Sequence, residues 1–102
     1  MKELTAGQIT RDAMLMLEDR HCFVWRNNNL AVPGRKFTGL KGVSDIIGFQ
    51  KKTGIAVYVE VKTKNDKVSE FQRNFMIRAK TAGCIVLIAY DDDGKTNLKT
   101  WE

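Results

Sequence analysis

The chain has 102 residues, of which 43% are hydrophobic and 28% are charged, as in proteins that fold around one hydrophobic core. This length suits one domain and is too short for two domains with separate cores, so we expect residues 1–102 to form a single domain. Lys and Arg outnumber Asp and Glu by 17 to 12, which gives a net charge of +5. Such a basic excess favours an anionic partner, first of all nucleic acid, although it also suits a basic protein without one.

The sequence argues against a membrane protein. No stretch approaches the roughly 18 consecutive apolar residues that a spanning helix needs, and residues 1–12 lack the apolar run of a signal peptide. We therefore expect a cytoplasmic protein with no membrane partner. Cys22 and Cys84 lie in apolar runs without a CxxC spacing, which is typical of reduced, largely buried thiols.

The first half of the chain predicts one helix and three strands. Residues 5–20 carry apolar side chains at helical spacing. A short β-prone run follows at 22–25, and the segment 30–42 then has little periodicity, with three glycines and several basic residues, so we expect a basic loop there. The runs 43–49 and 55–62 favour two further strands joined by a turn.

The second half predicts a helix followed by a buried strand. The helix begins at Ser69, and Phe71, Phe75, Ala79 and Ala82 mark its expected buried stripe. The segment after this helix, 84–90, is a continuous apolar run, which is typical of a strand buried on both faces. We expect 95–102 to add a short edge strand. The predicted order of the main elements is α-β-β-β-α-β.

The segment 55–62 carries the residues that suggest chemistry. Its residues alternate, so the three valines face one side of a strand while Tyr58, Glu60 and Lys62 face the other. If this strand pairs antiparallel with the strand before it, Asp45 and Glu60 lie at matching distances from the turn at 51–54. Two carboxylates would then be close neighbours across the two strands.

Two neighbouring carboxylates are the minimum set for a hydrolytic magnesium site. Mg²⁺ binds through one or two carboxylates while keeping several waters, and Asp45 and Glu60 supply them. The backbone carbonyl of Val61 could add a third oxygen. Lys62 would place a cation on the same face, where it could orient water or stabilise charge that develops on a phosphate.

Each of these residues also has a purely structural interpretation. Glu60 and Lys62 could form an ordinary solvent-exposed ion pair, and Asp45 could simply begin a strand. Gln72 lies three residues after Ser69, as the second residue of a capping box does. Both interpretations of Gln72 therefore remain open from spacing alone.

The combination of these motifs resembles the PD-(D/E)xK nuclease superfamily, and in particular its VRR-NUC branch. The resemblance extends from the first predicted helix to about Tyr90. The motifs that carry it are, in chain order, Val24-Trp25-Arg26-Asn27, Gly42-x-Ser44-Asp45-Ile46, Glu60-Val61-Lys62 and Ser69-x-x-Gln72.

The resemblance implies a restriction-endonuclease-like α/β fold with a mixed central sheet flanked by helices. It also implies Mg²⁺- or Mn²⁺-dependent cleavage of DNA and, for minimal members, a homodimer that acts on branched DNA such as four-way junctions. By this resemblance Asp45 and Glu60 are metal ligands, Lys62 is the catalytic lysine, and Gln72 lies beside the metal. The family often adds an acidic residue from the first helix, which is missing here, and Gln8 is the candidate to reach the site through a water.

Binding of DNA requires a track of basic side chains that neutralises phosphates. The candidates near the predicted site are Arg26, Arg35, Lys36, Lys41, Lys64 and Lys67. No recognition-helix or zinc-finger signature is present, so we expect recognition of backbone or shape rather than of bases.

Two hypotheses follow for the function. The first is a metal-dependent DNA endonuclease that acts on four-way junctions or flaps in phage or bacterial DNA processing. The second is a non-catalytic nucleic-acid-binding module on the same scaffold.

Overall fold

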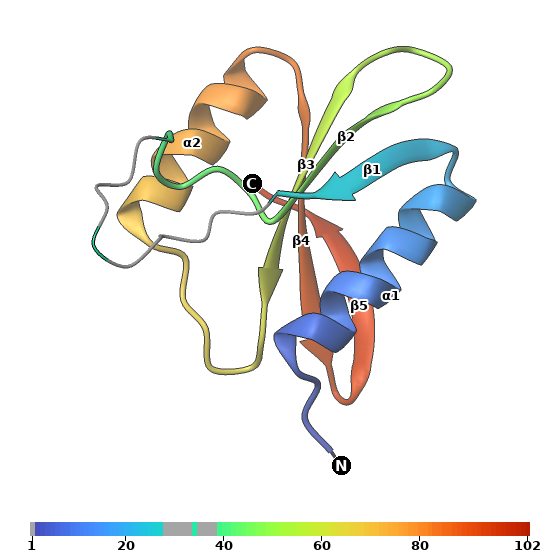
Figure 1. Ribbon diagram of the computed structural model, residues 1–102, viewed down its shortest axis with the longest axis vertical. Coiled ribbons are helices and arrows are strands. Elements are labelled where there is room, and N and C mark those ends of the chain that lie inside the picture. Colours follow the sequence, from blue (N-terminus) through green and yellow to red (C-terminus); the bar gives the residue numbers. More distant parts are fainter. Residues whose placement is uncertain (1, 28–33, 35–38) are drawn as a thin grey trace.

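The computed structural model describes residues 2–27, 34 and 39–102. Two helices and five strands follow one another along the chain (Figure 1). In order they are α1 (Ala6–Asp19), β1 (Cys22–Arg26), β2 (Ile46–Gln50), β3 (Ala56–Lys62), α2 (Glu70–Thr81), β4 (Ile85–Asp92) and β5 (Lys95–Thr100). The predicted order of elements is confirmed, and the expected edge strand after 95 is present as β5.

The five strands form one mixed sheet with the order β1-β2-β3-β4-β5. The pair β3–β4 is parallel, and the other three pairs are antiparallel. A parallel pair needs a crossover connection, and α2 supplies it between β3 and β4. The predicted α/β fold, with a mixed sheet flanked by helices, is thus confirmed.

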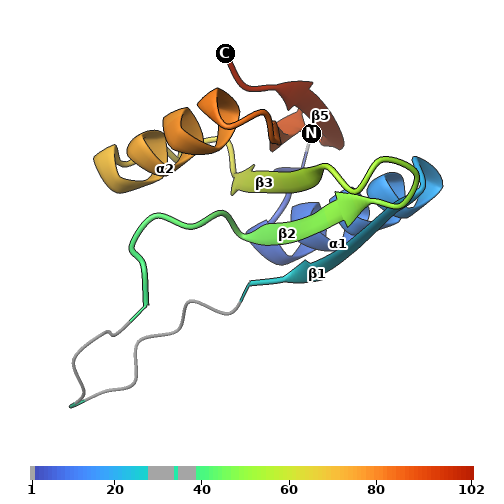
Figure 2. The same ribbon diagram turned by 90° about the horizontal axis from the view of Figure 1, so that it is seen from above.

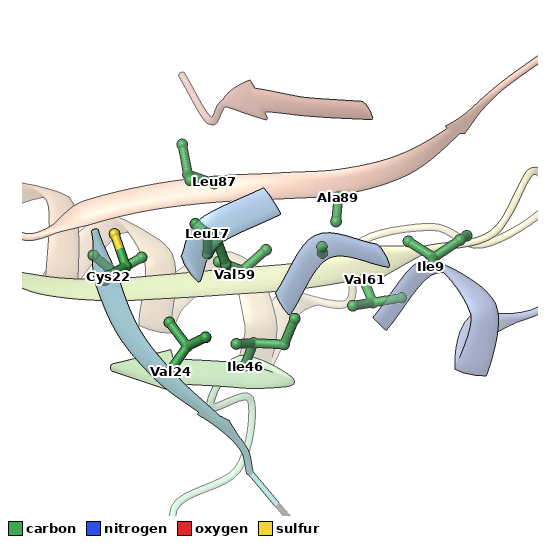
Figure 3. Packing of buried hydrophobic residues seen from close by; sticks show 11 residues of the cluster. Ile9, Leu17, Cys22, Val24, Ile46, Val59, Val61, Leu87 and Ala89 are labelled. Atoms are coloured by element: carbon green, nitrogen blue, oxygen red, sulfur yellow. The ribbon is translucent and has the colours of Figure 1, made fainter. Parts of the chain in front are cut away.

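The two helices lie on opposite faces of the sheet, as Figure 2 shows from above. Alternate residues of β3 prove this arrangement: Val57, Val59 and Val61 join the buried cluster that α1 covers, whereas Tyr58 packs in the cluster that α2 covers. The alternation predicted from the sequence is therefore confirmed. In Figure 3 the α1 residues Ile9 and Leu17 lie over Val59, Val61 and their neighbours.

A capping box closes the start of α1. The Gln8 amide N–H donates to Thr5 Oγ1 at 3.2 Å, and the Thr5 N–H donates to Gln8 Oε1 at 2.9 Å. These two bonds satisfy donors that would otherwise lack a partner at the helix start. The Gln8 side-chain oxygen is therefore committed to the helix end.

The buried stripe of α2 differs from the predicted one. Met76 and Ala79 are buried and Phe75 is partly buried, but Phe71 is 57% exposed and Ala82 is exposed. The helix is rotated so that Gln72 rather than Phe71 turns towards β3. Met76 and Ala79 pack with Val86 and Ile88 of β4, while Gln72 hydrogen-bonds Glu60 and Lys62 of β3.

The remaining sequence expectations concern the thiols and the membrane. Cys22 is buried, Cys84 is partly exposed, and both are free thiols. Neither α1 nor α2 has the length and apolar character of a helix that could cross a membrane, in the part of the chain that the structure describes.

Candidate active site

The register of β2 and β3 brings the two predicted carboxylates together. Ile46 pairs with Val59 in this antiparallel ladder, so Asp45 comes next to Glu60 at the end of β2. Asp45 Oδ2 accepts a hydrogen bond of 2.8 Å from the Val61 N–H. This bond fixes the Asp45 carboxylate against the backbone of β3, as the hairpin argument predicted.

Gln72 connects the other site residues through one side-chain amide. Its Nε2 donates to Glu60 Oε1 at 2.8 Å, while its Oε1 accepts from Lys62 Nζ, also at 2.8 Å. The same oxygen accepts from the Ser69 N–H at 2.9 Å. The capping interpretation of Gln72 is therefore confirmed, and the same amide also holds Glu60 and Lys62, as a role in an active site would require.

A close approach of the backbone places the start of α2 against the segment before β2. Gly42 has a φ of +87°, and a Cβ atom there would fall on the Phe71 carbonyl and within 2.8 Å of the Gln72 nitrogen. Only glycine permits both this conformation and this contact. The glycine of the Gly-x-Ser-Asp motif thus positions Gln72 relative to Asp45.

Glu60 is fully buried, although the sequence left open an exposed ion pair. That structural interpretation is wrong, because α2 covers this part of β3. Glu60 Oε2 and Ser44 Oγ are both buried and neither completes a hydrogen bond within the described residues. The nearby Ser44 hydroxyl favours the charged form of Glu60 and so acts to lower its pKa. An unsatisfied buried carboxylate oxygen is costly, which is typical of a group that awaits a ligand.

The pKa of Glu60 is raised to about 9. The largest cause is burial, which disfavours the carboxylate, followed by the adjacent Asp45 carboxylate; Lys62 acts in the opposite direction. Without a bound cation Glu60 is therefore protonated at neutral pH. A metal ligand must be ionised, so binding of a cation at Glu60 would release this proton.

The site opens into a cavity of about 340 Å³. Three groups of residues line it: Asp45, Val61, Lys62 and Gln72 from the predicted set, Arg26 and Asn27 at the end of β1, and Ala6, Thr10 and Asp66. Lys62 Nζ also donates to the Lys67 carbonyl at 3.0 Å, so the ammonium is held by two acceptors. The cavity therefore presents acid, amide and cation together.

The residues that α1 places at the active-site cavity do not include Gln8. Gln8 lines a separate cavity, and Ala6 and Thr10 are the α1 residues at the cavity that contains Asp45. Thr10 Oγ1 donates to the Ala6 carbonyl at 2.8 Å. Among the described residues no cluster of three or more His, Cys, Asp or Glu side chains could hold a metal, so a cation would depend on two carboxylates, a backbone carbonyl and water.

Three polar residues of the site were missed by sequence reasoning. Asn27 donates from its backbone N–H to the Asp45 carbonyl at 2.8 Å and from Nδ2 to the Ser44 carbonyl at 3.3 Å. Asp66 accepts from the Thr63 N–H and hydroxyl at 3.0 and 2.7 Å, which lowers its pKa. The third is Thr10. Asn27 was signalled by the Val-Trp-Arg-Asn motif, whereas nothing in the local sequence distinguished Thr10 or Asp66.

The predicted basic track is only partly described. Arg26 lines the site cavity, and Lys64 and Lys67 are exposed on the connection after β3. Lys41 is exposed beside the start of α2, with Nζ 5.2 Å from the centre of the Phe71 ring. Arg35 and Lys36 lie outside the described residues.

Comparison with known proteins gives a consistent assignment. The sequence profile of the VRR-NUC domain matches residues 11–92. The structure is similar to Hjc, a Holliday junction resolvase of Archaeoglobus fulgidus, with a TM-score of 0.62 and 14% identity over 92% of this chain and 75% of that one. It is also similar to a structure described as a VRR_NUC domain, with a TM-score of 0.57 and 24% identity over 83% of this chain and 84% of that one.

A search of curated proteins gave no significant match. At these identities the structural likeness shows the fold, and it confirms the predicted restriction-endonuclease-like architecture.

The raised pKa of Glu60 predicts how stability depends on pH in the presence of a chelator. Because this pKa lies above the ordinary value of 4.5 for a glutamate, the stabilising protonated form persists at low pH and is lost as pH rises towards about 9. The free energy of unfolding should therefore fall by up to about 1.4 kcal/mol per pH unit over that window. Glu60→Gln cannot ionise, so it should remove this slope and raise stability at pH 8.

Urea denaturation between pH 5.5 and 8.5 would measure the effect. Glu3→Gln, at an exposed position, is the matched control and should follow the wild-type protein. The same slope in wild type and Glu60→Gln would contradict the assignment.

Proposed function

This chain belongs to the VRR-NUC family of PD-(D/E)xK nucleases, and from that premise we propose that it is a Mg²⁺- or Mn²⁺-dependent DNA endonuclease. Its proposed substrates are four-way junctions or flaps in phage or bacterial DNA processing. The observation that carries the proposal is the single Gln72 amide that holds Glu60 and Lys62 beside Asp45. Asp45, Lys62 and Gln72 line the cavity, and the Gln72 amide joins them to the buried Glu60 carboxylate behind its wall.

The proposed metal ligands are Asp45, Glu60 and the Val61 carbonyl. The unsatisfied Glu60 Oε2 supports this assignment, because a divalent cation would complete the interactions of that oxygen. Mg²⁺ tolerates so few protein ligands because it keeps several waters. When bound, such an ion neutralises the phosphate and makes a coordinated water a better nucleophile.

Lys62 and Gln72 have distinct proposed roles. The ammonium of Lys62 is held by the Gln72 and Lys67 oxygens, so its third N–H can act on the attacking water or on a phosphate oxygen that gains charge. Gln72 donates a hydrogen bond to Oε1 of Glu60, which leaves Oε2 of Glu60 available for a cation. Gln72 is thus proposed to orient both the acid and the cation.

DNA is the proposed partner, in line with the basic composition. Arg26 at the cavity and the exposed Lys41, Lys64 and Lys67 would contact phosphates flanking the cleaved bond, and Arg35 and Lys36 retain this proposed role. Contacts of this kind position the protein without reading bases. They suit a nuclease that selects substrates by shape.

We also propose a homodimer, which would present two sites to two strands of a junction. Support comes from an aromatic patch of Phe23, Trp25 and Phe49 on the half of the sheet that α2 leaves uncovered. Their side chains are 53%, 43% and 39% exposed, and the Phe23 ring lies 5.8 Å from Trp25 and 5.5 Å from Phe49. Exposed apolar patches of this kind often mark protein interfaces.

Substitutions at the site should separate cleavage from binding. Asp45→Asn and Lys62→Met should each lower cleavage of a labelled junction by at least about 100-fold, because each removes a group that acts on the transition state. Binding of the same junction should stay within about threefold, since phosphate contacts dominate affinity.

Gel-based cleavage and fluorescence anisotropy would measure the two quantities. Lys52→Met, at an exposed turn position, is the matched control. Wild-type cleavage rates in either site variant would refute the proposed roles, and binding without any cleavage by the wild type would favour the non-catalytic module.

The dimer proposal is tested at the aromatic patch. Phe23→Lys places a charge in the proposed interface and should convert a dimer to a monomer in analytical ultracentrifugation. The Phe23 side chain is half exposed, so the variant should still fold, which circular dichroism would verify. A wild-type monomer, or an unchanged dimer in the variant, would exclude this patch as the interface.

A further inference from the structure

A second cavity, of about 550 Å³, adjoins the active-site cavity along the outer face of α1. Thr10 and Arg26 line both cavities, so the two share a wall. The larger cavity takes most of its other lining from α1, including Gln8, Arg11, Met14 and Leu15. None of these four residues has a role in the proposed chemistry. The Leu15 side chain is 59% exposed, so it is not part of the hydrophobic core.

We propose that this cavity binds one unpaired nucleotide of the DNA strand that is cleaved, next to the scissile phosphate. The inference rests on the proposed function and names the feature of the substrate that the enzyme selects. A volume of about 550 Å³ falls within the usual range of small-ligand sites.

The lining chemistry fits a nucleotide whose phosphate lies by the two arginines and away from Glu18, the one acidic residue in the lining. Met14 and Leu15 offer an apolar surface for the face of a base, and Met is a side chain that adapts to flat ligands. Arg11 and Arg26 stand at the same cavity, and a guanidinium can bind a phosphate with two hydrogen bonds or stack on a base. Gln8 Oε1 is held by the Thr5 N–H, so its amide nitrogen is the atom that could donate to a base edge.

The connection with the active site favours DNA over another partner. Arg26 lines both cavities. When one phosphate of a DNA strand lies beside Asp45, the next nucleotide of that strand can therefore reach the second cavity. The lining side chains from Gln8 to Leu15 extend over about 10 Å of helix, which is room for one unstacked nucleotide. A paired base stays stacked inside its duplex and could not enter, so occupancy requires a flap, a bulge or a junction branch point.

The test uses the catalytically inactive Glu60→Gln protein and DNA that carries the fluorescent base 2-aminopurine. The probe is placed at the first unpaired nucleotide on either side of a flap branch point, and at the same positions in a fully paired duplex. One flap position should show a saturable fluorescence change of about twofold or more on binding, because base stacking and burial alter this signal. The paired duplex should show none.

Variants then locate the nucleotide in the cavity. Leu15→Gln and Arg11→Ala should each weaken flap binding about fivefold, in line with loss of about 1 kcal/mol of contact, and should leave duplex binding within about twofold. The matched controls lie outside this cavity: Ile77→Gln on the exposed side of α2 and Arg20→Ala at the end of α1. They should leave both substrates unchanged.

Equal effects on flap and duplex, or no fluorescence change at any position, would overturn the inference. Saturation of the cavity by a free deoxynucleoside monophosphate, without preference for the flap, would also overturn it. Cleavage of the same flap by wild-type protein with Mg²⁺ is measured in parallel. Flap-selective binding without cleavage would refute the proposed nuclease activity but support the nucleotide site. Cleavage of the flap at the same rate by wild type and Leu15→Gln would support the nuclease activity but refute the nucleotide site.

Discussion

The hydrogen bonds of the Gln72 side-chain amide tie the start of α2 to the site residues of β3. One amide closes the capping box of α2, donates to Glu60 and accepts from Lys62. It therefore fixes where α2 begins, how the helix is rotated over the sheet, and which oxygen of Glu60 remains unsatisfied. Gly42 reinforces the same arrangement, because its missing side chain lets the segment before β2 touch the first turn of α2.

The cost of this arrangement is concentrated at Glu60. A fully buried carboxyl group beside Asp45 is stable only when it is protonated or when it binds a cation. The parallel pair β3–β4 and the two hydrophobic clusters on either side of the sheet hold the backbone that carries it. A stable scaffold thus maintains a site that is itself unfavourable without its ligand, as is common in enzymes.

The features of the fold and the site that the sequence predicts are local or nearly so. The alternation of 55–62 and the turn at 51–54 placed Asp45 beside Glu60, because both residues lie at similar distances from one hairpin turn. The burial of Glu60 and the exposure of Phe71 were not predictable, since both depend on how α2 docks on β3. Thr10 and Arg26 reach the same cavity from α1 and β1 only through the packing of the complete sheet, which no local pattern encodes.

Cleavage of labelled DNA would show directly whether this protein is a metal-dependent nuclease. Purified protein would be incubated with four-way junction, flap, linear duplex and single-stranded DNA in Mg²⁺, in Mn²⁺ and in a chelator, with Glu60→Gln in parallel. We expect metal-dependent cuts in branched DNA that are absent from the variant and from the chelated sample. Cuts that persist in Glu60→Gln, or in the chelator, would contradict it.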